Sequence, residues 1–196
     1  MKVLVACEFS GTIRDAFTKP GHTAWSCDLL PSETPGNHYQ CDVREILNDN
    51  WDLIIAHPAC TYLTNSGVCW LHSDCSRWVK LFEAAEFFKL FLNHKCPKIC
   101  VENPIMHKYG KQLIGVSQTQ VIQPYQFGHL ERKATCLWLK GLPELQPTKD
   151  VKAEMLKLPK NKQQRLHYLS PSPDRAKIRS RTFKGIAEAM ATQWNN

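Results

Sequence analysis

The stretch DLIIAHPAC, residues 52–60, decides the fold class of this chain. Residues 53–56 form an apolar, β-prone run that is typical of a strand buried in a sheet. Pro58 ends that strand because proline has no N–H to donate to a neighbouring strand. Cys60 therefore lies just beyond the carboxyl end of a predicted strand, where open α/β sheets place their ligands.

Similar short apolar runs alternate with amphipathic stretches along the rest of the chain. We expect strands at residues 2–7, 23–27, 52–56, 98–101 and 133–139, and helices at residues 12–19, 74–93 and 182–194. The helix at 74–93 has apolar residues at helical spacing, namely Trp78, Leu81, Phe82, Ala85, Phe88 and Leu92. This alternation is typical of a parallel sheet between two layers of helices. The predicted fold class is α/β, a doubly wound, mainly parallel sheet with helices on both faces.

The composition predicts a globular protein of one domain. The chain has 196 residues, of which 43% are hydrophobic and 22% are charged, and this suits a single core. No apolar run approaches the roughly 20 residues of a membrane span, and the start MKVLVACEF is too short for a signal peptide. We therefore expect a cytoplasmic protein without a membrane partner. Nine cysteines, an odd number, favour buried thiols in a reducing compartment, and no metal site is expected.

A basic segment separates the last predicted strand from the last predicted helix. Residues 143–173 are rich in lysine and proline and lack periodicity, which predicts an extended, solvated insert that reaches to about residue 179. The formal net charge of +7 favours a polyanionic partner. The insert either tracks phosphates, with Tyr168 stacking on a base, or is simply a solvated loop.

Several residues at the other predicted strand ends are candidates for binding a ligand. The turn at Phe9, Ser10 and Gly11 lets a backbone approach a cofactor closely, although a plain tight turn explains it as well. Asp28 and Asp42 follow further strand or loop ends. Each of them is either an acid that binds a ligand or a cap that forms a turn.

Cys60 and Glu102 are the candidates for chemistry. A thiol held near a cation or a helix N-terminus can act as a nucleophile, but Cys60 is otherwise an inert core cysteine. Glu102 and Asn103 end the next strand, so we expect them at the same edge of the sheet. A desolvated carboxyl group beside a cysteine can stay protonated near neutral pH and donate a proton.

The order of these residues resembles the motif series of the DNA (cytosine-5)-methyltransferases. The similarity covers nearly the whole chain and rests on Phe9-Ser10-Gly11, Asp28, Asp42, Pro58-Ala59-Cys60, Val101-Glu102-Asn103 and Arg132-Lys133. Residues 180–191 are similar to the final motif of that family, which returns the C-terminal helix to the cofactor pocket. The resemblance implies one methyltransferase-like domain over residues 1–196, with S-adenosylmethionine as methyl donor.

The resemblance also implies which residues bind the cofactor. The set is Phe9, Ser10 and Gly11 at the methionine part of S-adenosylmethionine, Asp28 at the ribose hydroxyls, Asp42 at the adenine amino group, and Pro58.

The implied catalytic set is Cys60, Glu102 and Arg132. Cys60 would attack C6 of a cytosine, and Glu102 would bind N3 and the exocyclic amine. Covalent addition is needed because C5 of a pyrimidine is otherwise a poor nucleophile.

The chain departs from the family in several places, among them Thr61 where the family has a glutamine and Pro104 after Asn103. The family usually has two prolines before the cysteine, and Ala59 replaces the second of them here. Its paired arginines are represented by Arg132 and Lys133. Residues 143–179 occupy the space of a separate target-recognition domain, which indicates a minimal, phage-like enzyme that reads little sequence context.

Three functions therefore stay open. The first is methylation of cytosine in duplex DNA, with the target base flipped out of the stack. The second is the same thiol chemistry on a free pyrimidine nucleotide, with the basic segment binding one phosphate. The third is an inactive module that binds nucleic acid or a partner. The sequence makes no prediction of the oligomeric state.

Overall fold

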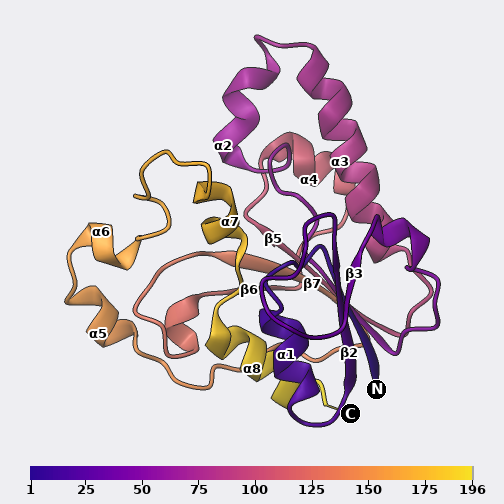
Figure 1. Cartoon of the computed structure of the whole chain (residues 1–196). Helices are drawn as coiled ribbons and strands as arrows, with labels where there is room; N and C mark the ends of the chain where they lie inside the picture. Colours follow the sequence, from indigo (N-terminus) through magenta and orange to yellow (C-terminus); the bar gives the residue numbers. More distant parts are fainter. Residues whose placement is uncertain (196) are drawn as a thin grey trace.

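The computed structural model describes residues 1–195, apart from the side chains of residues 66 and 67. A seven-stranded sheet runs through it in the order β3-β2-β1-β4-β5-β7-β6 (Figure 1). The strands are β1 (Lys2–Ala6), β2 (Thr23–Asp28), β3 (His38–Gln40), β4 (Leu53–Ala56), β5 (Lys98–Pro104), β6 (Gln120–Ile122) and β7 (Thr135–Lys140). The first five strands pair in parallel, whereas β7 is antiparallel to both β5 and β6. The predicted α/β class with a mainly parallel sheet is confirmed.

Helices cover both faces of this sheet. They are α1 (Thr12–Thr18), α2 (Asn65–Val68), α3 (Ser76–Leu92), α4 (Lys108–Ile114), α5 (Lys152–Leu156), α6 (Lys160–Gln163), α7 (Arg175–Ser180) and α8 (Lys184–Gln193), with short 3-10 helices at Val43–Glu45, Cys69–Leu71 and Pro124–Gln126. On one face α1 packs against α8, and on the other face α3 packs against α4. No helix among residues 1–195 is both long and apolar enough to cross a membrane.

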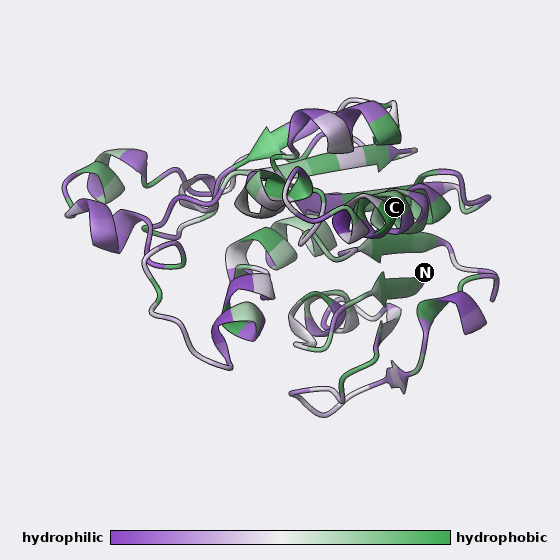
Figure 2. Ribbon diagram, turned by 90° about the horizontal axis from the view of Figure 1, so that it is seen from above, coloured by the Kyte–Doolittle hydropathy of each residue, from purple (hydrophilic) through white to green (hydrophobic). Residues whose placement is uncertain are grey.

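The central strands are apolar on both sides because each face of the sheet is buried under helices. Successive side chains of β1 enter different cores: Leu4 and Ala6 pack in the cluster beneath α3, and Val3 and Val5 pack in the cluster beneath α1 and α8. All four of these side chains are completely buried. Figure 2 shows the apolar strands running between the helix layers.

The C-terminal helix is anchored by a histidine outside it. The backbone N–H of Gly185 donates a hydrogen bond of 2.9 Å to Nε2 of His129. Glycine is required at position 185 because a Cβ there would lie 2.1 Å from the carbonyl oxygen of Phe127. The imidazole of His129 therefore accepts a hydrogen bond from a backbone N–H group in the first turn of α8. Such N–H groups have no partner within the helix itself.

This anchor should make stability depend on pH. Burial lowers the pKa of His129, against the opposing charges of Glu131 and Glu188. Since the folded pKa lies below the unfolded one, the contribution to the free energy of unfolding is complete above about pH 6.5 and is lost as the pH falls through the folded pKa. Urea unfolding should therefore give a lower free energy of unfolding at about pH 5 than at about pH 7.5. The difference should be smaller in His129→Gln, because the glutamine amide oxygen accepts the hydrogen bond from Gly185 at both pH values. An identical loss in both proteins would contradict this role.

Some elements differ from the sequence prediction. The segment after β7 is not an extended insert, because it folds into α5, α6 and α7 and buries Leu145, Val151 and Met155. In Figure 1, α5 and α6 lie to one side of the sheet, away from α3. Within α3, Phe82 was expected on the buried face, but its side chain is 53% exposed.

Candidate functional site

The carboxyl ends of β1, β4 and β5 meet at one edge of the sheet. The register pairs Ala6 with Ala56, and Ala56 with Val101. The next residues along these strands therefore come together, which brings His57 beside Glu102. Cys60 lies in the loop that follows His57.

His57 and Glu102 form a buried pair. Nδ1 of His57 lies 2.8 Å from Oε2 of Glu102, and the two side chains are 13% and 11% exposed. Burial alone would raise the pKa of Glu102, but the charge and hydrogen bond of His57, together with Lys133, hold that pKa below its usual value. Burial would lower the pKa of His57, but Glu102 outweighs it and raises that pKa. Both shifts favour an imidazolium paired with a carboxylate over the protonated carboxyl group that burial alone would favour.

Cys60 is a half-buried thiol with cations nearby. Burial raises the pKa of the Cys60 thiol, and the charges of Lys133 and Arg179 oppose that shift. Nζ of Lys133 donates a hydrogen bond of 3.0 Å to the carbonyl oxygen of Arg179, which joins the segment before β7 to the end of α7. The two cations favour the thiolate, which is the reactive form of a cysteine.

Arg132, the basic residue expected in the catalytic set, is exposed, and its backbone N–H donates to the carbonyl oxygen of Gln163. The cation whose charge acts on Cys60, Glu102 and His57 is Lys133. Neighbouring side chains along an extended segment point to opposite sides, so one of two adjacent basic residues faces the site. The alternation along β7 could have indicated this choice.

The loop that carries Cys60 is held by its neighbours. Nδ2 of Asn103 donates a hydrogen bond of 3.0 Å to the carbonyl oxygen of Pro58, and both residues are buried. The carbonyl oxygen of Cys60 accepts hydrogen bonds from the backbone N–H groups of Leu63 and Thr64. Asn103 thus ties the end of β5 to the loop after β4, so that Pro58 supports the loop through its carbonyl group.

The turn after β1 is tight and polar inside. The Glu8 carboxylate is buried and accepts hydrogen bonds from the backbone N–H groups of Ile13 and Arg14 at 2.7 and 3.2 Å, and from the hydroxyl of Ser10. It therefore caps the first turn of α1, where a negative charge is favourable. Gly11 has a φ of 72°, and a Cβ there would lie 2.3 Å from Oγ1 of Thr34. Sequence reasoning identified the turn but assigned no role to Glu8.

Asp28 forms a turn at the end of β2, and Asp42 caps the 3-10 helix Val43–Glu45. Oδ1 of Asp28 accepts from the backbone N–H of Leu30 at 2.9 Å, and Oδ1 of Asp42 accepts from that of Arg44 at 2.9 Å. Burial raises the pKa of Cys7, and the charges of Asp28 and Asp42 add to that shift, so each acid acts on the thiol at the end of β1.

A cavity of about 50 Å³ lies between the turn after β1 and the segment before α8. Its lining consists of Cys7, Glu8, Phe9, Ser10, His57, Ser180, Arg181 and Thr182. The guanidinium of Arg181 binds the Glu33 carboxylate through two contacts of 2.9 and 2.6 Å, which ties this segment to the loop after β2. This cavity is smaller than the roughly 300–1,000 Å³ of the pockets that hold small organic ligands.

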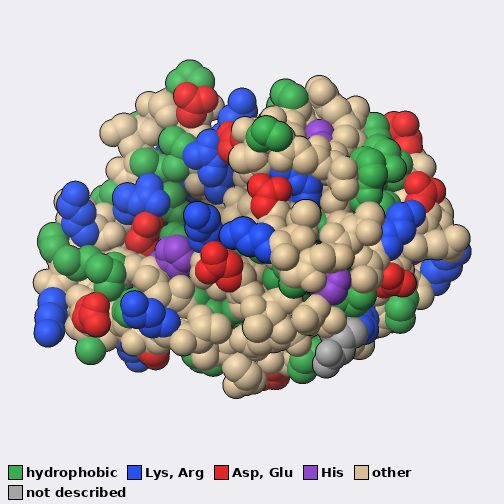
Figure 3. Space-filling model, turned by 60° about the horizontal axis from the view of Figure 1, so that its bottom comes forward, with side chains coloured by type: hydrophobic (Ala, Val, Ile, Leu, Met, Phe, Trp, Pro, Cys, Tyr) green, Lys and Arg blue, Asp and Glu red, His purple; other side chains and the backbone are tan. Residues whose placement is uncertain are grey.

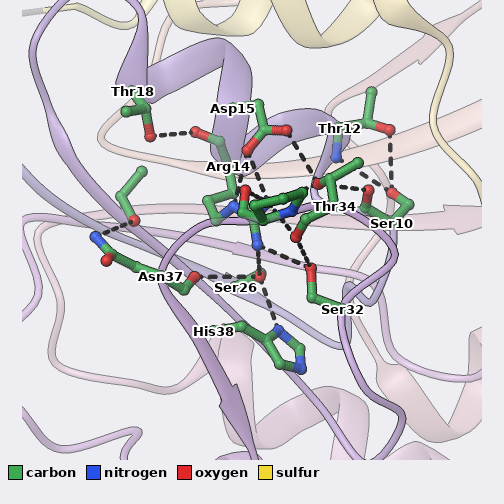
Figure 4. A network of polar contacts seen from close by, with 12 residues as sticks. Ser10, Thr12, Arg14, Asp15, Thr18, Ser26, Ser32, Thr34, Asn37 and His38 are labelled. Atoms are coloured by element: carbon green, nitrogen blue, oxygen red, sulfur yellow. Dashed lines mark hydrogen bonds and ion pairs between the residues drawn. The ribbon is translucent and has the colours of Figure 1, made fainter.

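A buried arginine holds the loop after β2 in place. Arg14 is 1% exposed, and its guanidinium donates to the hydroxyls of Ser26, Ser32 and Thr34 and to the carbonyl oxygens of Thr34 and Pro35 (Figure 4). The network also supports Thr34 where it contacts Gly11. Arg14 therefore holds the loop after β2 against the turn at Gly11.

Comparison with known proteins finds limited similarity. No family model matches the chain, and no curated protein matches it in sequence. Among solved structures, it is similar to a protein described as a DNA modification methyltransferase encoded within an E. coli prophage, with 17% identity and a TM-score of 0.49 over 82% of this chain. It is also similar to the S. pombe Dnmt2 methyltransferase, with 11% identity and a TM-score of 0.43 over 90% of this chain. The chain spans 56% and 62% of the lengths of these two proteins.

Proposed function

We propose that this protein is a DNA methyltransferase that transfers a methyl group from S-adenosylmethionine to C5 of cytosine, with Cys60 as covalent nucleophile. The observation that supports the proposal is the placement of Cys60, just after β4, and of Glu102, in the neighbouring β5, at one edge of the sheet, with the charge of Lys133 acting on both. The motif order of the sequence supports the same function.

Cys60 activates the base. When its thiolate adds to C6, the C6–S bond forms and electron density shifts through C5 towards N3, which makes C5 nucleophilic. Glu102 binds N3 and the exocyclic amine, and Lys133 stabilises the thiolate before addition. Once C5 carries the methyl group, the C5 proton passes to water, its electron pair re-forms the C5=C6 bond, and the C6–S bond breaks to release the thiolate. Splitting the substitution into addition and elimination replaces one difficult step by two easier ones.

The residues near the cavity fit S-adenosylmethionine in their chemistry. Asp28 and Asp42 are carboxylates at the ends of β2 and β3, suited to accept hydrogen bonds from ribose hydroxyls and an adenine amino group. The turn of Phe9 to Gly11 and the loop of Pro58 would hold the methionine part. When bound, the cofactor supplies the methyl group. The cavity of about 50 Å³ beside the Phe9 to Gly11 turn can take only part of the cofactor, and the remainder would lie along Asp28 and Asp42.

DNA is the partner that the charges favour. Arg179 in α7 lies close enough to Cys60 to act on its thiol, so the basic segment borders the site itself. Tyr168 is 56% exposed and is available for stacking on a base. On the face shown in Figure 3, lysine and arginine side chains are interspersed with acidic ones instead of forming one basic patch. The phosphate contacts are therefore assigned to the segment that contains α5, α6 and α7.

Incubation with S-adenosylmethionine labelled at the methyl group tests the proposal. Duplex DNA, single-stranded DNA and free deoxycytidine monophosphate are supplied in parallel, followed by nucleoside analysis. Label should appear in 5-methylcytosine from DNA. Label only in the free nucleotide would support the second substrate class, and no label with any substrate would leave the inactive binding module.

The salt dependence of DNA binding should locate the phosphate contacts. The affinity should fall linearly in a plot of log affinity against log salt, with a slope of about −0.9 for each phosphate contact. Lys160→Gln with Lys162→Gln, both exposed in the native protein, should reduce the slope by about one or two. Lys19→Gln with Lys95→Gln removes the same charge elsewhere and should leave the slope unchanged. Equal slopes for both double variants would contradict a role of α6 in phosphate binding.

A further inference from the structure

His57 has one ring nitrogen paired and the other without a partner. Nδ1 contacts Glu102 at 2.8 Å, whereas the buried Nε2 has no hydrogen-bond partner among the residues that the structure describes. A buried polar atom without a partner is uncommon and destabilises the folded state unless something outside the chain satisfies it. His57 also lines the cavity, which is large enough to hold a water molecule.

Charged groups face His57 from several elements and act on the proton that it shares with Glu102. Glu102 faces it from β5, Glu8 and Cys7 from the end of β1, and Lys133 from the residues before β7. Arg181 closes the cavity from the segment before α8. The two carboxylates stabilise the imidazolium, while Lys133 opposes it and stabilises ionised Glu102. An ionised Glu102 lacks the proton that N3 of a cytosine must receive when Cys60 adds to C6.

We propose that His57 is the positioning residue that supplies this proton, passing it through Glu102 to N3 of the base and taking it back afterwards. The inference rests on the proposed function and deepens it. It gives His57 the role that a protonated carboxyl group would otherwise fill.

The step balances in atoms and charge. The Cys60 thiolate forms the C6–S bond, the C5=C6 electron pair moves to C4–C5, and the C4=N3 pair moves to N3. N3 takes a proton from Glu102, and Glu102 takes one from Nδ1 of His57, so the imidazolium becomes neutral imidazole. When the thiolate leaves and the ring is restored, N3 returns its proton to Glu102 and His57. No redox partner is involved.

His57→Asn is the discriminating variant because its amide can still donate a hydrogen bond to Glu102 but cannot release a proton. The readout is the rate of covalent adduct formation with DNA that contains 5-fluorocytosine. Wild type should show a bell-shaped pH dependence, rising as Cys60 ionises and falling as His57 loses its proton. His57→Asn should be slower by about 100-fold or more, the scale of general acid catalysis, and should keep only the rising limb. His57→Gln with unchanged circular dichroism serves as the second variant.

A measurement that needs no activity examines the pair itself. The imidazole resonances of His57 in the nuclear magnetic resonance spectrum should titrate above the usual histidine range in wild type and shift back towards it in Glu102→Gln. Two outcomes would overturn the inference: a His57→Asn rate and pH profile like those of wild type, or a His57 titration that Glu102→Gln does not change. Failure of wild type to form any adduct would instead overturn the proposed function, and the inference with it.

Discussion

Cys60→Ser will lose methyl transfer by several orders of magnitude, the scale seen when an enzyme loses its nucleophile. Serine is nearly the same size as cysteine, but its hydroxyl ionises far less readily than a thiol, so Lys133 and Arg179 cannot generate a comparable nucleophile. The half-buried position should tolerate the change, so thermal unfolding and binding of S-adenosylmethionine should remain as in wild type. The measurement is the rate of label transfer to DNA under saturating substrate.

Cys69→Ser provides the matched control. Cys69 is an exposed cysteine in the same part of the chain, and its thiol lies in the 3-10 helix that follows α2. Its replacement should leave the rate of methyl transfer within about twofold of wild type, because surface substitutions are usually neutral. Full activity in Cys60→Ser, or an equal loss in Cys69→Ser, would contradict the assignment of the nucleophile.

Arg14→Met should lower the free energy of unfolding by about 1–3 kcal/mol, the cost of leaving buried polar groups without a hydrogen-bond partner. Methionine fills most of the volume but leaves the hydroxyls of Ser26 and Ser32 and the carbonyl oxygen of Pro35 without their donor. The loop after β2 would lose its anchor, so the affinity for S-adenosylmethionine should fall as well. Urea unfolding and calorimetry measure the two effects.

Arg44→Met is the control for that experiment. The Arg44 side chain is 67% exposed and pairs with Asp42 on the surface. Exposed ion pairs contribute at most about 1 kcal/mol, so its replacement should cost less than that. A comparable decrease in the free energy of unfolding in both variants would contradict the prediction that the buried hydrogen bonds of Arg14 contribute more than an exposed ion pair.

The sheet and the position of Cys60 could be predicted because the signals are local. An apolar run that ends at Pro58 indicates a buried strand, and the next such run delivers Glu102 to the same edge. The pairing of His57 with Glu102 could not be predicted, since it depends on the register between β4 and β5. That register is set by the packing of both faces of the sheet and leaves no local signal.

Short elements were missed for a related reason. β3 and β6 have three residues each, and α5 and α6 have five and four, which is too short for a hydrophobic period to appear. They are held by tertiary contacts, as with Met155, which is buried from within a lysine-rich segment. Phe82 has the spacing of a buried residue, but α3 buries a narrower face, formed by Leu81, Ala85 and Phe88.

Trapping with DNA that contains 5-fluorocytosine tests the central claim most directly. Fluorine at C5 blocks the elimination step because no proton is there to leave, so the bond between the enzyme and C6 should persist. In the presence of S-adenosylmethionine, wild type should gain the mass of the oligonucleotide and one methyl group, and proteolysis should map the adduct to the peptide that contains Cys60. An adduct on Cys69 or Cys75, or methylation of ordinary cytosine with no adduct on the fluorinated base, would contradict the account.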